Sequence, residues 1–145
     1  MIRVVRFRAE HLAALDLQPA QRSLREDVAN PDYGRTLQDC EYAFSALAGD
    51  RVVACAGVQE IWTGRAMAWA LVGADSGTYF LAVHRAVSGF LAQAPWRRVE
   101  MVVENDFKAG HRWARMLGMT GEGLMRGYSP SGVDFYLYAR VRDEQ

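Results

Sequence analysis

The chain has little of what builds disulfide scaffolds, metal centres or membrane spans. Its 145 residues include two cysteines, Cys40 and Cys55, without a CxxC pair, and three histidines far apart in sequence. We therefore expect neither a disulfide framework nor a zinc site, and we expect Cys55, in the apolar run VVACAGV, to be a buried reduced thiol. No apolar run reaches membrane length, and the N-terminus MIRVVRFRAEH lacks the hydrophobic region of a signal peptide. These absences favour a cytoplasmic location.

The chain also has no excess of either charge, because Lys+Arg and Asp+Glu both number 17. This balance is not that of a general nucleic-acid binder. It provides little electrostatic repulsion between copies, so a homodimer is compatible with it. What the chain does have is apolar material: half of the residues are hydrophobic, and there are 4 Trp, 6 Tyr and 6 Phe. This amount supports a real core, and the length suits a single domain over residues 1–145.

Hydrophobic periodicity predicts the order of the elements. The expected strands cover residues 2–7, 42–47, 51–62, 66–72, 99–104, 124–128 and 133–141, and the expected helices cover residues 9–17, 20–29, 78–92 and the segment after residue 105. The order β α α β β β α β α β β predicts an α+β fold. Its sheet is expected to be mixed and mainly antiparallel, with six to seven strands flanked by about four helices. The tryptophans are expected in the core or in the wall of a cleft.

The most informative segment is VEMVVENDFKAGHRWARMLGM, residues 99–119. It combines a strand, a turn containing Asn105 and Asp106 that can cap the next helix, and a helix that Gly118 would end as a left-handed cap. This pattern resembles the last βα unit of the GNAT superfamily, the Gcn5-related N-acetyltransferases. The order of elements matches that family over nearly the whole chain, so the resemblance implies one GNAT-like domain with an acyl-coenzyme A cleft.

The resemblance also implies where acetyl-CoA would bind. In the family, backbone amides of a glycine-rich loop before a helix hold the pyrophosphate of the cofactor. This chain reads LVGADSGT there, and the cofactor-binding candidates are Leu71, Val72, Gly73, Ser76, Gly77 and Thr78, joined by Asn105 and Trp113 from the later unit. The loop lacks the family's basic or amide residue, and Asp75 places a negative charge where a diphosphate would approach. A plain capped turn is the alternative interpretation.

The catalytic candidates follow from the same resemblance. Many members have a tyrosine on the last helix that protonates the leaving thiolate, but the matching position here is Ala114, which cannot donate a proton. Tyr128 is the candidate acid in its place, although Tyr136 or Tyr138 could also serve. Glu60, in the strand end VQEIW, is the candidate general base. The alternative for Glu60 is a carboxylate on a solvated strand face.

Two functions are therefore open. The first is an acetyl-CoA-dependent N-acetyltransferase that acts on a small-molecule or protein amine. The second follows from a finer resemblance, carried by AWALVG, ADSG and HRWARMLGM, to a GNAT-like branch in tailed bacteriophages and prophages that includes internal virion proteins. It implies a catalytically degenerate GNAT-fold protein with a virion-structural or host-protein-binding role, located in the virion with other phage virion proteins as partners.

Overall fold

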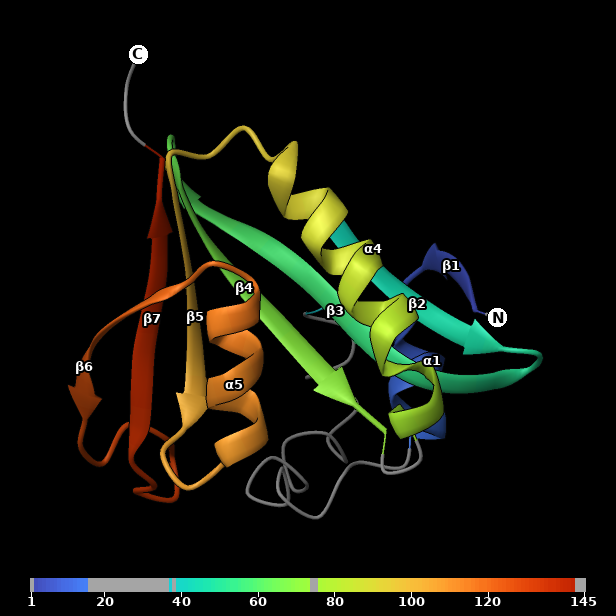
Figure 1. The fold of residues 1–145 in the computed structure, drawn as a ribbon. Coiled ribbons are helices and arrows are strands. Elements are labelled where there is room, and N and C mark those ends of the chain that lie inside the picture. Colours follow the sequence, from blue (N-terminus) through green and yellow to red (C-terminus); the bar gives the residue numbers. More distant parts are fainter. Residues whose placement is uncertain (1, 16–36, 38, 74–75, 143–145) are drawn as a thin grey trace. The chain divides into compact units, whose positions relative to one another are not determined.

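A computed structural model describes residues 2–15, 37, 39–73 and 76–142 (Figure 1). The predicted helix over residues 20–29 and the loop residue Asp75 lie outside these ranges. The elements are β1 (Arg3–Arg6), α1 (Ala9–Ala14), β2 (Tyr42–Ala48), β3 (Arg51–Trp62), β4 (Arg65–Val72), the 3₁₀ helix η2 (Ser76–Tyr79), α4 (Phe80–Ala92), β5 (Arg98–Glu104), α5 (Lys108–Met116), β6 (Thr120–Met125) and β7 (Phe135–Val141). No helix in the described ranges is long and apolar enough to cross a membrane.

The seven strands are hydrogen-bonded in the order β1-β2-β3-β4-β5-β7-β6. β4 and β5 are parallel, with Arg65–Met67 paired to Arg98–Glu100, and α4 lies on the crossover that a parallel pair requires. The pairs β1–β2, β2–β3, β5–β7 and β6–β7 are antiparallel. The predicted α+β fold with a mixed, mainly antiparallel sheet is confirmed, with three α-helices in the described residues.

The chain packs into two compact units, unit 1 (residues 1–59 and 69–93) and unit 2 (residues 60–68 and 94–145). In unit 1, α4 lies along β2 and β3 (Figure 1), and the Phe90 ring centre is 5.8 Å from that of Tyr42. The core of unit 1 is formed by Phe7, Leu12, Leu15, Leu37, Cys40, Ala43, Leu47, Val52, Cys55 and Leu71. Both thiols are buried and unbridged, which confirms the prediction for Cys55.

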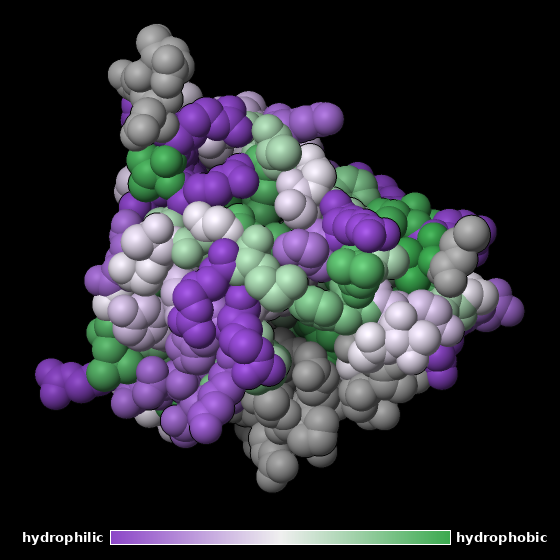
Figure 2. All heavy atoms as spheres, in the orientation of Figure 1, coloured by the Kyte–Doolittle hydropathy of each residue, from purple (hydrophilic) through white to green (hydrophobic). Residues whose placement is uncertain are grey.

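In unit 2, α5 lies beside β5 and buries Gly110, Trp113 and Ala114. The helix comes so close that a Cβ on Gly110 would lie 2.7 Å from Cγ1 of Val103. Hydrophilic side chains cover the outward face of α5, as Figure 2 shows. This division into an apolar inner face and a polar outer face explains why so short a helix folds here, since packing rather than propensity stabilises it.

The end of α5 confirms the cap that the sequence predicts. Gly118 has φ +82°, and its N–H donates to the carbonyl of Arg115 at 3.0 Å, while the N–H of Met119 donates to the carbonyl of Ala114 at 3.0 Å. These two bonds form a Schellman motif. Because only glycine adopts this backbone without steric cost, Gly118 determines where the chain leaves the helix for β6.

Two predictions at the ends of unit 2 elements are wrong. β6 begins at Thr120 rather than at residue 124. Gly121 and Gly123 are not loop residues: Gly121 allows close packing against β7, and a bulge lies between the two glycines. A Cβ on Gly121 would lie 2.8 Å from Cε1 of Tyr136 on β7, and the register shifts between the two glycines. In addition, neither Asn105 nor Asp106 caps α5, because the N-cap is Phe107 and its side chain makes no capping bond.

Candidate functional site

The end of β4 is held firmly inside unit 1. Leu71 and Val72, two of the predicted cofactor residues, are 2% and 5% exposed. The N–H of Gly73 donates to the carbonyl of Val53 on β3 at 2.8 Å. The N–H of this buried glycine is therefore not available to a ligand. Burial of the two apolar side chains positions this backbone, and Leu71 belongs to the core of the unit.

Within the described part of the chain, the start of α4 has room around Gly77 and no capping bond from the side chain of its N-cap residue. Ser76, Gly77 and Thr78 lie in the 3₁₀ turn η2 that leads into the helix, and a Cβ on Gly77 would meet nothing within 4 Å. Tyr79 is the N-cap of α4 and makes no side-chain capping bond, and neither η2 nor α4 has an acidic residue in its first turn. Backbone N–H groups at such a helix start, together with the helix dipole, favour an anion. These described residues fit a diphosphate.

The Asn105 turn joins three segments of unit 2. The N–H of Asn105 donates to the carbonyl of Asp134 at 2.9 Å, and Oδ1 of Asp134 accepts the N–H of Gly127 at 2.8 Å. Gly127 precedes Tyr128, so Asp134 brings the predicted cofactor residue Asn105 close to the turn that carries the predicted acid Tyr128. The sequence did not reveal Asp134, because its partners lie far from it along the chain.

His111 is a second residue whose contacts the sequence did not reveal. Its Nε2–H donates to the carbonyl of Asn105 at 2.9 Å. In the neutral ring, Nδ1 is then an acceptor, and the hydroxyl of Tyr138 donates to it at 2.6 Å. Tyr138 is 4% exposed on β7. Unit 2 thus has a hydrogen-bonded His–Tyr pair between α5 and β7, and His111 lies about one helical turn before the fully buried Ala114.

The remaining candidates are separate from these clusters. Glu60 is exposed near the end of β3, and Tyr128 is 49% exposed with its ring 5.3 Å from that of Phe135. β4 separates β3 from β5 in the strand order, so Glu60 and Asn105 are not on adjacent strands. Trp113 is 7% exposed and packs inside unit 2, which leaves its indole little surface for a cofactor.

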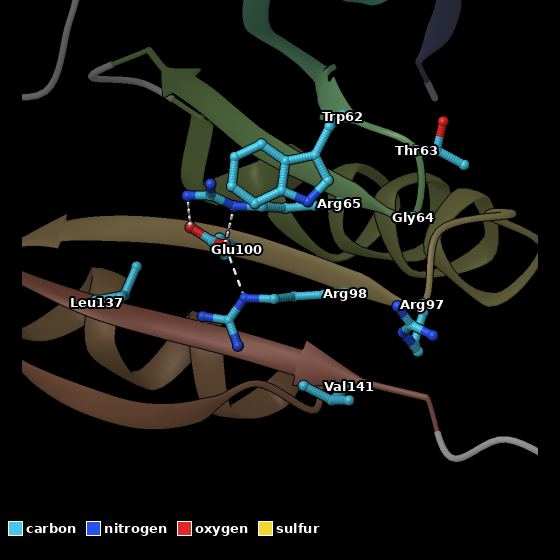
Figure 3. A pocket seen from close by; sticks show the side chains of 9 residues that line it. All are labelled: Trp62, Thr63, Gly64, Arg65, Arg97, Arg98, Glu100, Leu137 and Val141. Carbon is cyan, nitrogen blue, oxygen red and sulfur yellow. Dashed lines mark hydrogen bonds and ion pairs between the residues drawn. The ribbon is translucent and has the colours of Figure 1, made fainter.

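Unit 2 also contains a pocket of about 490 Å³ at the start of β4 and β5 (Figure 3). Glu100 lies at its centre and is 3% exposed. Its Oε2 accepts Nε–H of Arg65 at 2.5 Å and Nε–H of Arg98 at 2.7 Å, and its Oε1 accepts Nη2–H of Arg65 at 3.0 Å. Arg98 also binds Glu122 through both terminal nitrogens, at 3.0 and 2.5 Å. The result is a continuous chain of four alternating charges.

This network changes the titration of its members. The hydrogen bonds from Arg65 and then Arg98 hold the pKa of Glu100 below its ordinary value, although burial opposes this effect. The hydrogen bonds to Glu122 and Glu100 raise the pKa of Arg98. All four groups are therefore charged at neutral pH.

Trp62 lies at the edge of the pocket. It is 62% exposed and lines the pocket, so of the two expected positions it has the one in a cleft wall, whereas Trp96 and Trp113 are buried in the core. Figure 3 shows its indole lying over Arg65, with the guanidinium carbon 4.4 Å from the ring centre. A cation–π contact of this kind orients both side chains.

Comparison with solved structures identifies the fold. Ard1 from Thermoplasma volcanium aligns with a TM-score of 0.79 at 15% identity and covers 99% of both chains. A GNAT-family acetyltransferase from Bacillus anthracis aligns at 0.70 and 14% identity over 99% of this chain and 96% of its own. The ribosomal-protein-S5-alanine acetyltransferase from Vibrio fischeri aligns at 0.68 and 12% identity, over 99% and 94%. No protein-family model and no curated protein matches the sequence. The chain thus has the fold of the GNAT acetyltransferases.

Proposed function

We propose that the protein is an acetyl-CoA-dependent N-acetyltransferase. The observation that carries this proposal is the start of α4, whose N-cap Tyr79 makes no side-chain capping bond, after the buried end of β4 in a chain with the fold of GNAT acetyltransferases. Backbone amides around Ser76, Gly77 and Thr78 would hold the diphosphate, because N–H groups at a helix start favour an anion. Leu71, Val72 and Gly73 would hold the pantetheine arm through backbone groups.

The proposed chemistry is direct transfer in a ternary complex. Bound acetyl-CoA supplies an activated acetyl thioester. Glu60, exposed on β3, would accept a proton from the acceptor amine, directly or through a water, so that the nitrogen lone pair can attack the carbonyl carbon. As the C–N bond forms, the C–S bond breaks, and Tyr128 would give its proton to the leaving thiolate. Asn105 would position the cofactor through its turn. Ala114 cannot take the role of an acid.

Calorimetry with acetyl-CoA tests the cofactor site, and two glycines of unit 1 provide a matched pair of variants. Gly77 and Gly89 both have open space where a Cβ would lie, so Gly77→Glu and Gly89→Glu add the same charge without a clash. We expect Gly77→Glu to weaken acetyl-CoA binding about tenfold or more through repulsion of the diphosphate, and Gly89→Glu to bind as the wild type does. Asp75→Ala should strengthen binding.

A second candidate is a GNAT-fold protein that binds a partner and transfers no acetyl group. The full burial of Ala114, 0% exposed where the family resemblance places a tyrosine, favours it. The phage or virion role is one form of this candidate. Absence of acetyl-CoA binding in wild type and in Asp75→Ala would support it and would exclude the transferase. An acetyl-transfer assay against a panel of amines, followed by release of free thiol, would then identify the acceptor if binding is found.

A further inference from the structure

The pocket at the start of β4 and β5 is distant from the Asn105 turn of unit 2, whereas Glu60 lies on β3 two residues before the lining residue Trp62. Arg98 begins β5 and Asn105 follows its end, so they are about 23 Å apart at roughly 3.3 Å per residue. The pocket is lined by the side of β5 that carries Arg98 and Glu100, whereas Val103 on the other side faces α5. Binding of a ligand in this pocket would not require acetyl transfer.

The polar groups of the pocket offer hydrogen-bond donors. Glu100 is nearly inaccessible and already accepts three hydrogen bonds. Arg98 donates through all three of its nitrogens to Glu100 and Glu122. Arg65 differs, because within the described part of the chain no acceptor meets its Nη1. One edge of an oriented guanidinium therefore remains for a ligand, and such an edge recognises carboxylate or phosphate oxygens.

The apolar groups of the pocket indicate what the rest of an anionic ligand would be. One face of the Trp62 indole covers Arg65, and 62% of the residue remains exposed. Leu137 and Val141 add apolar surface, and Arg97 contributes a further guanidinium (Figure 3). A large exposed aromatic side chain beside arginines is the usual platform for stacking a planar ring. The volume of about 490 Å³ lies within the range of small-molecule sites.

We propose that this pocket binds a small planar aromatic molecule with an attached anionic group, its ring against Trp62 and its anion on the open edge of Arg65. Two sources supply this chemistry: a nucleoside monophosphate and an aromatic carboxylate. An anion without a ring would not stack on Trp62, and a neutral aromatic molecule would not form an ion pair with Arg65. Both halves are therefore required for full affinity.

Nitrogen-15 NMR of the full chain tests this proposal, because the tryptophan Nε1–H and arginine Nε–H signals report on the pocket directly. AMP and indole-3-acetate are the two ring-plus-anion probes, and adenosine and inorganic phosphate are the matched half-ligands. The Trp62 and Arg65 signals are assigned by their loss in Trp62→Leu and Arg65→Lys. We expect at least one full probe to shift both signals and to bind about tenfold more tightly than either half-ligand.

The variants give the second part of the test. Trp62→Leu and Arg65→Lys should each weaken binding about tenfold, followed through backbone amides of β5, while Arg126→Gln, an exposed arginine elsewhere in unit 2, should leave it unchanged. Circular dichroism and thermal midpoints show that each variant is folded. Binding by AMP alone identifies the phosphate source, and binding by indole-3-acetate alone identifies the carboxylate source.

Three results would overturn the proposal. One is the absence of any shift at Trp62 and Arg65 with both probes at millimolar concentration. Another is equal affinity for phosphate and AMP, which would leave no role for Trp62. The third is a shift confined to residues 76–78, which would place AMP at the start of α4. Failure of acetyl-CoA to bind in calorimetry would contradict the transferase and would leave the pocket result intact.

Discussion

The carboxylate of Glu100 accepts two hydrogen bonds from the guanidinium of Arg65, at 2.5 and 3.0 Å, across the parallel pair β4–β5. The two residues come from strands that share three paired positions, so the ion pair lies where these strands are joined. A buried carboxylate is costly unless it is matched by charged donors. Glu100 is matched by two arginines, and this predicts how the pairing of β4 and β5 responds to pH and mutation.

Glu100→Gln should lower the free energy of unfolding by about 1–3 kcal/mol at neutral pH, because charged donors lose a buried acceptor. The pKa of Glu100 is lowered in the folded state. Its contribution is therefore present above the unfolded value and is lost as the pH falls through the folded pKa. Urea unfolding at pH 7 and below pH 4 should show the gap between wild type and variant shrinking in acid.

Glu122→Gln is the control for this prediction. Glu122 binds the same Arg98, but 37% of its side chain is exposed, so water replaces much of the lost interaction. We expect a change below about 1 kcal/mol. An equal effect of both substitutions would mean that burial of Glu100 contributes nothing to the strength of the network.

Gly110→Ala should destabilise unit 2, since the added Cβ would lie 2.7 Å from both Val103 Cγ1 and Phe107 Cδ2. Overpacking of this kind costs about 1–3 kcal/mol. Gly89→Ala is the matched helix substitution in unit 1, because nothing lies within 4 Å of its added Cβ. It should stabilise the protein by about 0.5–1 kcal/mol through helix propensity. Thermal unfolding of the two variants should shift in opposite directions.

Neither thiol should react in the folded protein. Burial raises the pKa of the Cys55 thiol to about 11, and burial also raises the pKa of Cys40. The thiolate is the reactive form, so a disulfide reagent at pH 8 should label no cysteine natively and two in guanidinium chloride. Rapid native labelling would contradict the packing of unit 1. This inertness also keeps the background low in an assay that detects released coenzyme A.

Glu60→Gln tests the proposed general base. Because Glu60 is exposed on β3, the substitution should leave the unfolding midpoint unchanged and lower kcat about 100-fold or more. Binding of acetyl-CoA should be unaffected, which separates loss of proton transfer from loss of the cofactor. Glu41→Gln, another exposed carboxylate, is the control. An unchanged kcat in Glu60→Gln would move the search for the base to Glu104 or to a bound water.

The turn between β4 and α4 could be predicted because it is continuous in sequence. Gly73, Gly77 and Thr78 follow one another between a strand and a helix, and their local order alone marks a turn before the helix. The N–H of Gly73 is used within the sheet, where it donates to Val53. His111 was undervalued because its partner Tyr138 lies 27 positions away. Asn105 does not cap α5, because Asp106 and Phe107 separate it from the first residue of the helix. Its backbone instead binds His111 and Asp134.

The sequence by itself determined the order of the described elements and the end of α5 at Gly118. Each of these depends on side chains within a few positions of one another, where periodicity and backbone preference act. Only the tertiary structure decided that Glu100 is buried against Arg65, 35 positions away, and that Trp62 lies exposed over the same guanidinium. Strand pairing determines these contacts. The residues that a strand residue contacts across a sheet cannot be inferred from the sequence of its own strand.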